Sequence, residues 1–272
     1  MDQSINIHPR QAWEDLKREH VTAVVLVTTA VMVTVIEYFF LPESLRELFP
    51  QIVQKYAPGV WYGSWASTPV GSIAPWWGVF APWAWWMTGM LVFWVAVPMV
   101  CAKSMGFYLR DLGLSMRGLL PKLWIYGLLY LIVLVGIWWA SKQQGFTNTY
   151  PMLKPWYNEN WCWLVLLSWW ALYAVQFFVV EFFFRGWMLF TLEKRMGMAA
   201  IAVTIVPYCM IHYHKPAPEA LGAIVGGLVL GWLALKTRSI WGGWLVHVGV
   251  AITMDVAALT RGEWGMPTSF WP

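Results

Sequence analysis

The chain has 272 residues, of which 59% are hydrophobic and only 12% are charged. A soluble domain has about 45 to 50% apolar and about 25% charged residues, so this composition excludes an ordinary soluble protein and predicts one that lives in a lipid bilayer. The net charge of +4 is a modest surplus that membrane orientation explains, and it indicates no nucleic-acid partner.

The N-terminus and the cysteines narrow the class further. Residues 1–20 are polar and carry both charge signs, unlike a secretory signal peptide, so we expect a retained cytoplasmic segment before the first span. Cys101, Cys162 and Cys209 stand in apolar surroundings without a CxxC pair. Neither a disulfide framework nor a cysteine-bound zinc is indicated.

Seven apolar stretches approach the length of about 20 residues that a helix needs to cross the hydrocarbon core. They are Val21–Leu41, Trp77–Ala102, Leu123–Ala140, Leu164–Leu189, Met198–Tyr213, Leu221–Leu235 and Ile240–Leu259. Residues 43–76, between the first two, contain SLRELFPQIVQKY and a stretch rich in Gly, Pro and Trp, which predict an interfacial helix and a loop. The expected fold is an all-α polytopic membrane helix bundle with about seven transmembrane helices.

The basic residues predict the orientation of this bundle. If successive connections alternate between the two sides, 12 of the 18 Lys and Arg residues share the side of the N-terminus. Because Lys and Arg concentrate in cytoplasmic loops, we expect an integral protein of the cytoplasmic membrane with its N-terminus in the cytoplasm. The expected divisions are a cytoplasmic segment (1–20), N-terminal spans with the interfacial loop (21–108), a membrane core (109–259) and a C-terminal tail (260–272).

Ionisable side chains within the predicted spans are candidates for function, because each costs about 2.5 to 3.5 kcal/mol on insertion scales. They are Glu37, Glu181, Arg185, His212, His214, His247 and Asp255. Glu181 and Arg185 are four residues apart and therefore share a helix face. They form either a functional pair or a structural ion pair.

The fourth and fifth spans form a helical hairpin that turns near Met196. Glu181 lies fifteen residues before that turn and His212 lies sixteen after it. At a rise of about 1.5 Å per residue, both residues are roughly 22 to 24 Å from the turn, so we expect them at similar depth. Together with His247 on the last span, they predict an internal polar cavity shared by three helices.

Three segments then carry a family resemblance. VEFFFRGWML (Val180–Leu189), YCMIHYHKP (Tyr208–Pro216) and GLVLGWLALKTRSIWGGWLVHVGVA (Gly227–Ala251) resemble, in order and spacing, the motifs of the CAAX-protease and bacteriocin-processing family of glutamic-type intramembrane proteases. Upstream, LRDLGLSMRG (Leu109–Gly118) resembles the stretch that often precedes the family's core. The resemblance implies a helix bundle with a hydrophilic cavity and no cofactor. In it, a glutamate and a histidine activate water against a peptide bond, and a further histidine and an asparagine stabilise the oxyanion.

Two positions depart from these motifs. The first motif is Glu-Glu-x-x-x-Arg, and Val180 replaces its first glutamate, the base, while Glu181 and the arginine are kept. The third motif is His-x-x-x-Asn, and Ala251 replaces its asparagine. Loss of a general base typically costs 10² to 10⁴-fold in rate, so these two replacements predict weak or absent peptidase activity.

The second motif, Phe-x-x-x-His, appears with Tyr208 in the place of the phenylalanine. The resemblance carries over to four residues of this chain as candidates for the catalytic site. Arg185 holds Glu181, His212 orients water or a ligand, and His247 donates toward a carbonyl. The implied activity is that of an intramembrane endopeptidase on a membrane-associated or prenylated peptide.

A metal site is a second interpretation, because carboxylate and imidazole groups suit zinc. The ligands in this case are Glu181, His212, His214 and His247. Residues two apart on a helix diverge, so both His212 and His214 reach one metal only if the helix ends near Tyr213, as Pro216 and Pro218 indicate.

A third interpretation is a catalytically impaired relative that serves as a structural, assembly or regulatory subunit of a membrane protein complex. The two replaced positions favour it, as does a group of aromatic residues, a type enriched in partner interfaces. This group is Trp76, Trp77, Trp83, Trp85 and Trp86. The expected partners are therefore the lipid bilayer and either a peptide substrate or another membrane protein.

Overall fold

The computed structural model describes residues 19–51, 80–143, 145–154, 161–262 and 265–271. The long helical segments are α2–η1 (His20–Val35, Ile36–Phe40), α5–η3–α6 (Ala81–Leu91, Val92–Ala96, Val97–Ser104), α7 (Leu123–Ala140), α9–η7–α10 (Trp163–Glu181, Phe182–Leu189, Phe190–Met196), α11 (Ala199–Met210), α12 (Ala217–Thr237) and α13 (Trp241–Arg261). Short helices are α3 (Ser44–Leu48), η4 (Leu109–Leu112), η5 (Leu120–Lys122) and α8 (Phe146–Thr149). The segments η1, η3 and η7 are π-helical.

Six helical segments within the described part of the chain are long and apolar enough to cross a membrane, and α11 is a shorter apolar helix. This arrangement confirms the predicted all-α membrane bundle of about seven helices, and the chain is an integral membrane protein. The predicted N-terminal segment and most of the predicted interfacial region, from residue 52 to residue 76, lie outside the described residues. Only α3 represents that region.

Two helices differ in length from the prediction. The fourth runs without a break for 34 residues, from Trp163 to Met196, which is roughly 51 Å at 1.5 Å per residue and more than one hydrocarbon thickness. The fifth, α11, ends at Met210, and residues 211–214 form a turn. Pro216 then precedes α12, which has Pro218 in its first turn, where the missing N–H costs nothing.

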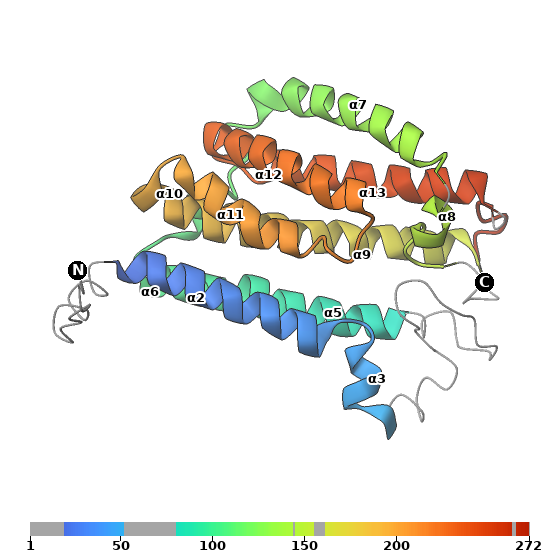
Figure 1. Cartoon of the computed structure of the whole chain (residues 1–272), viewed down its shortest axis with the longest axis horizontal. Coiled ribbons are helices and arrows are strands. Elements are labelled where there is room, and N and C mark those ends of the chain that lie inside the picture. Colours follow the sequence, from blue (N-terminus) through green and yellow to red (C-terminus); the bar gives the residue numbers. More distant parts are fainter. Residues whose placement is uncertain (1–18, 52–79, 144, 155–160, 263–264, 272) are drawn as a thin grey trace, which may run out of the picture.

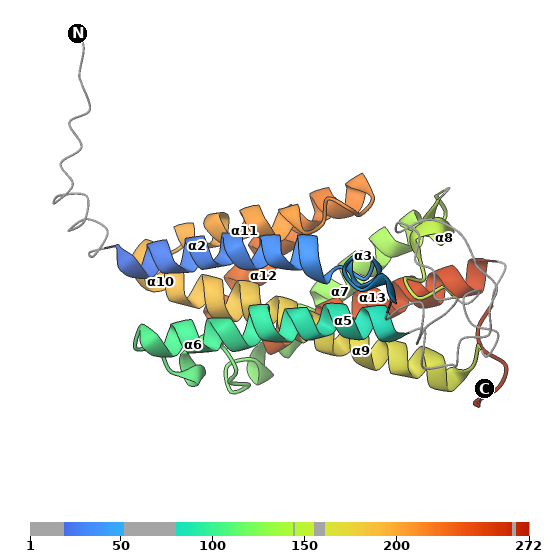
Figure 2. The same ribbon diagram turned by 90° about the horizontal axis from the view of Figure 1, so that it is seen from below.

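The helices lie nearly parallel around α9, as Figure 1 shows. The N-terminal segments α2 and α5–α6 lie on one side of α9, and α12 and α13 lie on the other; α7 lies outermost and packs on α13. Figure 2 shows α2 and α5 running side by side. The π-helical segment η7, which continues α9, is therefore enclosed, and all eight of its residues are buried.

The outermost helix presents its apolar side chains outward. The exposed large hydrophobic residues of α7 are Leu123, Trp124, Leu128, Leu131, Ile132, Val135, Trp138 and Trp139. Such a face is unfavourable in water and favourable in hydrocarbon, so it is the surface that the acyl chains contact.

One end of the bundle collects basic side chains. The ends of α6, α10 and α12 meet there, at the left of Figure 1. Arg110, Lys194 and Arg238 line one groove at this end together with Asp111 and Glu193. These three basic residues, which come from three separate connections between helices, thus meet in space.

Candidate active site

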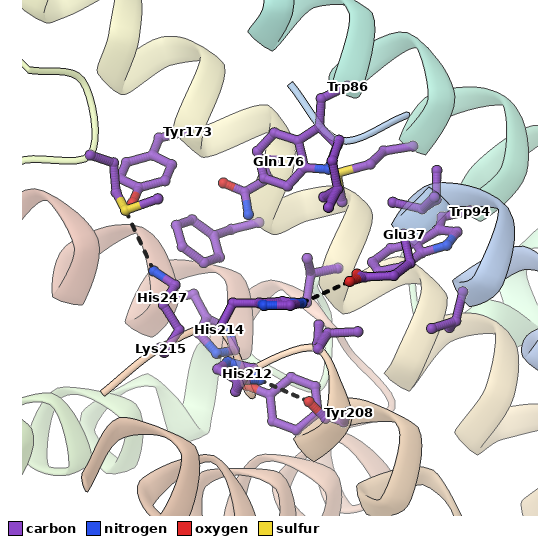
Figure 3. A pocket seen from close by; sticks show the side chains of 18 of the residues that line it. Glu37, Trp86, Trp94, Tyr173, Gln176, Tyr208, His212, His214, Lys215 and His247 are labelled. Carbon is purple, nitrogen blue, oxygen red and sulfur yellow. Dashed lines mark hydrogen bonds and ion pairs between the residues drawn. The ribbon is translucent and has the colours of Figure 1, made fainter. Parts of the chain in front are cut away.

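A cavity of about 130 Å³ lies between the N-terminal helices and the core of the bundle. Its walls come from α2–η1, α5, η3, α9, the segment after α11, α12 and α13. In Figure 3 Tyr208 and His212 lie on the side of the cavity opposite Trp86. The cavity is mixed in character, because Trp86 and Trp94 face it together with Gln176 and the imidazoles. Its volume is sufficient for several water molecules beside polar groups.

Glu181, at the end of α9, is the centre of a buried polar network. Its Oε1 lies 3.1 Å from Nη1 of Arg185 and 2.9 Å from Nδ1 of His247. The side chains of Glu181 and Arg185 are 1% and 2% exposed. A buried carboxylate is stable only when opposite charge and donors surround it, and here two cationic or donor groups from two helices do so.

Gly243 of α13 makes room for this carboxylate. A Cβ atom built at Gly243 would overlap Oε2 of Glu181. The glycine therefore allows the backbone of α13 to approach α9 closely enough for His247, four residues later and on the same face, to reach Oε1. The pair Gly242–Gly243 was not among the residues singled out from the sequence, because the requirement arises only when two helices meet.

Both ring nitrogens of His247 have partners. At 2.9 Å from Oε1, an unprotonated Nδ1 would place its lone pair against a carboxylate, so Nδ1 carries the proton, although its N–H is not aligned as a straight hydrogen bond. In the neutral ring Nε2 is then an acceptor, and the hydroxyl of Tyr208 donates to it at 2.9 Å. Phe177 stacks parallel to the imidazole, with ring centroids 5.4 Å apart.

His212 lies in the turn after α11 and lines the cavity. Its Nδ1 donates to the backbone carbonyl of Tyr208 at 2.8 Å, because a carbonyl oxygen can only accept. In the neutral ring the other nitrogen, Nε2, is therefore unprotonated. It can accept a hydrogen bond or a proton from water.

The structure brings the four candidate residues together in two layers. His212 and His247 line the cavity, whereas Glu181 and Arg185 lie behind His247 and do not. Val180 lines the cavity with its methyl groups, at the place of the glutamate in the resembled motif. The sequence predicted the contact of Glu181 with Arg185 and the similar depth of Glu181 and His212. It did not predict that the carboxylate would be shielded from the cavity.

Ala251 is also buried, but it packs in an apolar cluster with Trp83, Trp169 and Tyr173. No polar atom therefore replaces the asparagine amide at this position. A polar group that does face the cavity is Gln176, whose Oε1 has no hydrogen-bond partner among the described residues.

The rim of the cavity carries two further polar contacts. Nε2 of His214 lies 2.7 Å from Oε1 of Glu37, as the dashed line in Figure 3 marks, and joins η1 to the turn after α11. Nearby, the hydroxyl of Tyr150 donates to Glu219, which also faces Lys215 at 3.7 Å. Burial, with the adjacent Glu219, holds the pKa of Tyr150 far above its usual range, so this hydroxyl stays protonated and remains a donor.

The zinc interpretation receives no support from this geometry. Within the described residues no group of three or more His, Cys, Asp or Glu side chains is arranged to hold a metal ion. His214 faces Glu37 at the rim, and Oε1 of Glu181 contacts Arg185 and His247.

Asp255, the last ionisable candidate, belongs to a separate structural site. Its carboxylate accepts from Nε1 of Trp169 at 3.0 Å, from Nε1 of Trp170 at 3.3 Å and from the backbone N–H of Met152 at 3.4 Å. The side chain is fully buried. Asp255 thus attaches α9 and the loop at Met152 to α13, and it takes no part in the cavity.

Comparison with known proteins gives one match. Residues 161–253 match the model of a family described as type II CAAX prenyl endopeptidase Rce1-like. The matched residues contain the three motifs, so the match confirms the resemblance that those motifs carry. No curated protein and no solved structure matches the chain.

Proposed function

Because the segment that carries His212 and His247 matches the type II CAAX prenyl endopeptidase-like family, we propose that this protein is an intramembrane endopeptidase that hydrolyses a peptide bond of a membrane-associated chain. One observation carries the proposal. His212 and His247, from two separate motifs, line a single cavity inside an apolar bundle, with Glu181 and Arg185 directly behind His247.

The side chains have distinct parts in this reaction. His212 accepts a hydrogen bond from the attacking water at Nε2 and orients it, since its Nδ1 is occupied. Arg185 fixes the carboxylate of Glu181, and Glu181 in turn fixes His247. Val180 and Ala251 leave the site without the glutamate base and the asparagine donor of the resembled motifs, so turnover is slow. Losing one oxyanion donor alone costs about 10² to 10³-fold in kcat.

The cavity wall also indicates the kind of substrate. Trp83, Trp86, Met90 and Trp94 give one side of the cavity an apolar surface, whereas a peptide bond requires the polar side near His212. A peptide segment that enters from the bilayer, with apolar groups beside the scissile bond, fits both sides. Prenylated peptides are one member of this class.

The orientation that we propose places the basic end of the bundle in the cytoplasm. Arg110, Lys194 and Arg238 lie at that end, whereas the rim contact of Glu37 with His214 lies toward the other. The cavity then opens toward the non-cytoplasmic half of the cytoplasmic membrane. A reporter fused after residue 272 should be non-cytoplasmic and one inserted after Met196 cytoplasmic; two reporters on one side would contradict this topology.

Cleavage by the purified protein in liposomes tests the activity. The substrates are a library of membrane-inserted and prenylated peptides, and the products are identified by mass spectrometry. His212→Asn should abolish product, whereas His20→Asn, at the start of α2, should leave it unchanged. Absence of product from the wild-type protein, or equal product from His212→Asn, would refute the proposal.

A catalytically impaired subunit of a membrane protein complex is the second candidate. It is favoured by one observation, the methyl groups of Val180 and Ala251 where the motifs place reacting groups. Trp83 and Trp86 do not supply its partner surface, because Trp83 is buried against Trp169 and Trp86 lines the cavity. Trp76 and Trp77 lie outside the described residues. A stoichiometric membrane-protein partner that co-purifies with a chain lacking peptidase activity would favour this candidate.

A further inference from the structure

The hydroxyl of Tyr208 is the feature of the cavity that the resembled motif does not contain. That motif has a phenylalanine where this chain has Tyr208. The side chain is 3% exposed, lines the cavity, and brings its oxygen within 2.9 Å of Nε2 of His247. The exchange therefore adds one polar atom at the position where the cavity meets the buried network.

Three groups then stand in line from the interior to the cavity. The carboxylate of Glu181 faces Nδ1 of His247, and Nε2 of His247 faces the hydroxyl of Tyr208. An imidazole placed between a buried carboxylate and a hydroxyl can take the hydroxyl proton, because the carboxylate stabilises the imidazolium that forms. Here the hydroxyl belongs to a residue that reaches the cavity.

The other groups that line the cavity are less suited to serve as the base. Of the described residues that line the cavity, only Glu37 and Glu219 are acidic, and they pair with His214 and with Tyr150 and Lys215 at the rim. Val180 offers only methyl groups. His212 orients water, but no acidic side chain contacts its ring in the described structure, so an imidazolium there lacks the stabilisation that Glu181 gives to His247.

We infer that Tyr208 is a catalytic residue that replaces the missing glutamate base by relaying a proton from water to His247. The attacking water transfers a proton to the hydroxyl oxygen of Tyr208 as the hydroxyl proton passes to Nε2 of His247. The water oxygen forms a bond to the peptide carbonyl carbon, and the C–N bond then breaks. The proton returns from His247 through Tyr208 to the leaving amine, which restores both residues and balances the hydrolysis. This inference rests on the proposed function.

The surroundings of Tyr208 hold its ring in place and favour charge on its oxygen. The guanidinium carbon of Arg185 lies 4.0 Å from the ring centroid, a cation that stabilises electron density on the phenol. On another side, Gly227 of α12 leaves space for the ring, since a Cβ there would lie 3.3 Å from Cδ1 of Tyr208. The hydroxyl is thus directed by packing on two helices as well as by His247.

A double-mutant cycle separates the relay from a structural role. Tyr208→Phe should lower kcat by about 10²-fold or more, the size of a lost general base. Val180→Glu should raise kcat, because it places a carboxylate directly in the cavity. In the Val180→Glu background, Tyr208→Phe should change kcat by less than about threefold, since the two bases act in parallel and their effects are not additive. Tyr126→Phe is the matched control, because its buried hydroxyl contacts Thr237 away from the cavity.

A second readout uses the acidity of the hydroxyl. Site-specific replacement of Tyr208 by 3-fluorotyrosine and 3,5-difluorotyrosine retains the ring and the hydroxyl while making the hydroxyl progressively more acidic. If Tyr208 relays the proton, one limb of the plot of kcat against pH follows the ionisation of this hydroxyl. That limb should move to lower pH with one fluorine and further with two. A hydroxyl that only fills space leaves the profile in place.

The outcomes distinguish this inference from the proposed function. Three outcomes would contradict the relay while leaving the endopeptidase proposal standing. Tyr208→Phe could leave cleavage unchanged, or it could lower kcat equally in the wild-type and Val180→Glu backgrounds. Fluorination of Tyr208 could also leave the pH profile unchanged. No cleavage by the wild-type protein, including the case in which only Val180→Glu is active, contradicts both.

Discussion

Breaking the buried contact between Glu181 and Arg185 should destabilise the bundle strongly. Both side chains are nearly inaccessible and 3.1 Å apart. Removing one member of a buried pair typically costs about 3 to 5 kcal/mol, because it leaves an uncompensated charge. A loss of 3 kcal/mol already lowers the folding equilibrium constant by roughly 10²-fold.

The two single variants should differ, because the neighbours of the two residues differ. In Arg185→Met the carboxylate of Glu181 still has His247 at 2.9 Å, which can become protonated and form an ion pair, so the cost should be near the lower end of that range. In Glu181→Gln the guanidinium keeps its contact with the Tyr208 ring but has no carboxylate beside it among the described residues, so the cost should be near the upper end. The double variant should be more stable than Glu181→Gln alone.

The assay is unfolding by sodium dodecyl sulfate in mixed micelles, followed by far-UV circular dichroism. Glu193→Gln is the matched control, since Glu193 pairs with Arg238 at 2.9 Å but the two side chains are 23% and 61% exposed. A surface pair contributes roughly 0 to 1 kcal/mol. Equal losses from Glu181→Gln and Glu193→Gln, or strictly additive losses in the double variant, would show that the buried network does not hold the helices together.

Two further substitutions test the packing around this network. Gly243→Ala should displace the carboxylate of Glu181, lower stability by about 1 to 3 kcal/mol through overpacking and reduce kcat. Gly226→Ala is the control and should be neutral or stabilising, because a Cβ atom added at Gly226 meets no atom within 4 Å. Equal effects of the two substitutions would argue against the close approach of α13 to α9. Asp255→Asn should cost about 1 to 3 kcal/mol by leaving the Trp169 indole or a neighbouring donor without an acceptor, with peptide cleavage per folded molecule unchanged. A parallel loss of kcat would place Asp255 in the reaction.

Hydropathy predicted the helices because a bilayer requires every backbone polar group to be bonded within its own segment. The helices α7 and α13 begin and end within two residues of the predicted stretches. The boundaries of α11 were less predictable, since apolar residues continue beyond Met210 although the helix stops there. Pro216 and Pro218 indicated an end in this region, but composition does not locate the turn that carries His212 into the cavity.

Counting residues from the hairpin turn predicted that Glu181 and His212 lie at similar depth. In the structure His212 bonds the backbone carbonyl of Tyr208, and Glu181 contacts His247, which bonds the Tyr208 hydroxyl. Rise per residue fixes depth along a helix but not rotation about its axis. The rotation determines that Val180, and not Glu181, faces the cavity. It depends on how closely α13 approaches, and hence on Gly243, whose importance appears only in the packed structure.

The exchange of phenylalanine for tyrosine at position 208 is a conservative change in size, which is why a motif comparison treats it as minor. Its effect depends on what stands opposite the new oxygen. Against an apolar wall the hydroxyl would lack a partner and cost free energy, but here it meets the unprotonated nitrogen of an imidazole whose other nitrogen faces a buried carboxylate. Val180 removes a carboxylate from the cavity, while Tyr208 connects the carboxylate of Glu181 to the cavity through His247. If the two positions compensate in this way, the Val180→Glu variant should no longer need the hydroxyl of Tyr208 for cleavage. In that background Glu181→Gln should still lower the free energy of unfolding, but it should change kcat per folded molecule little.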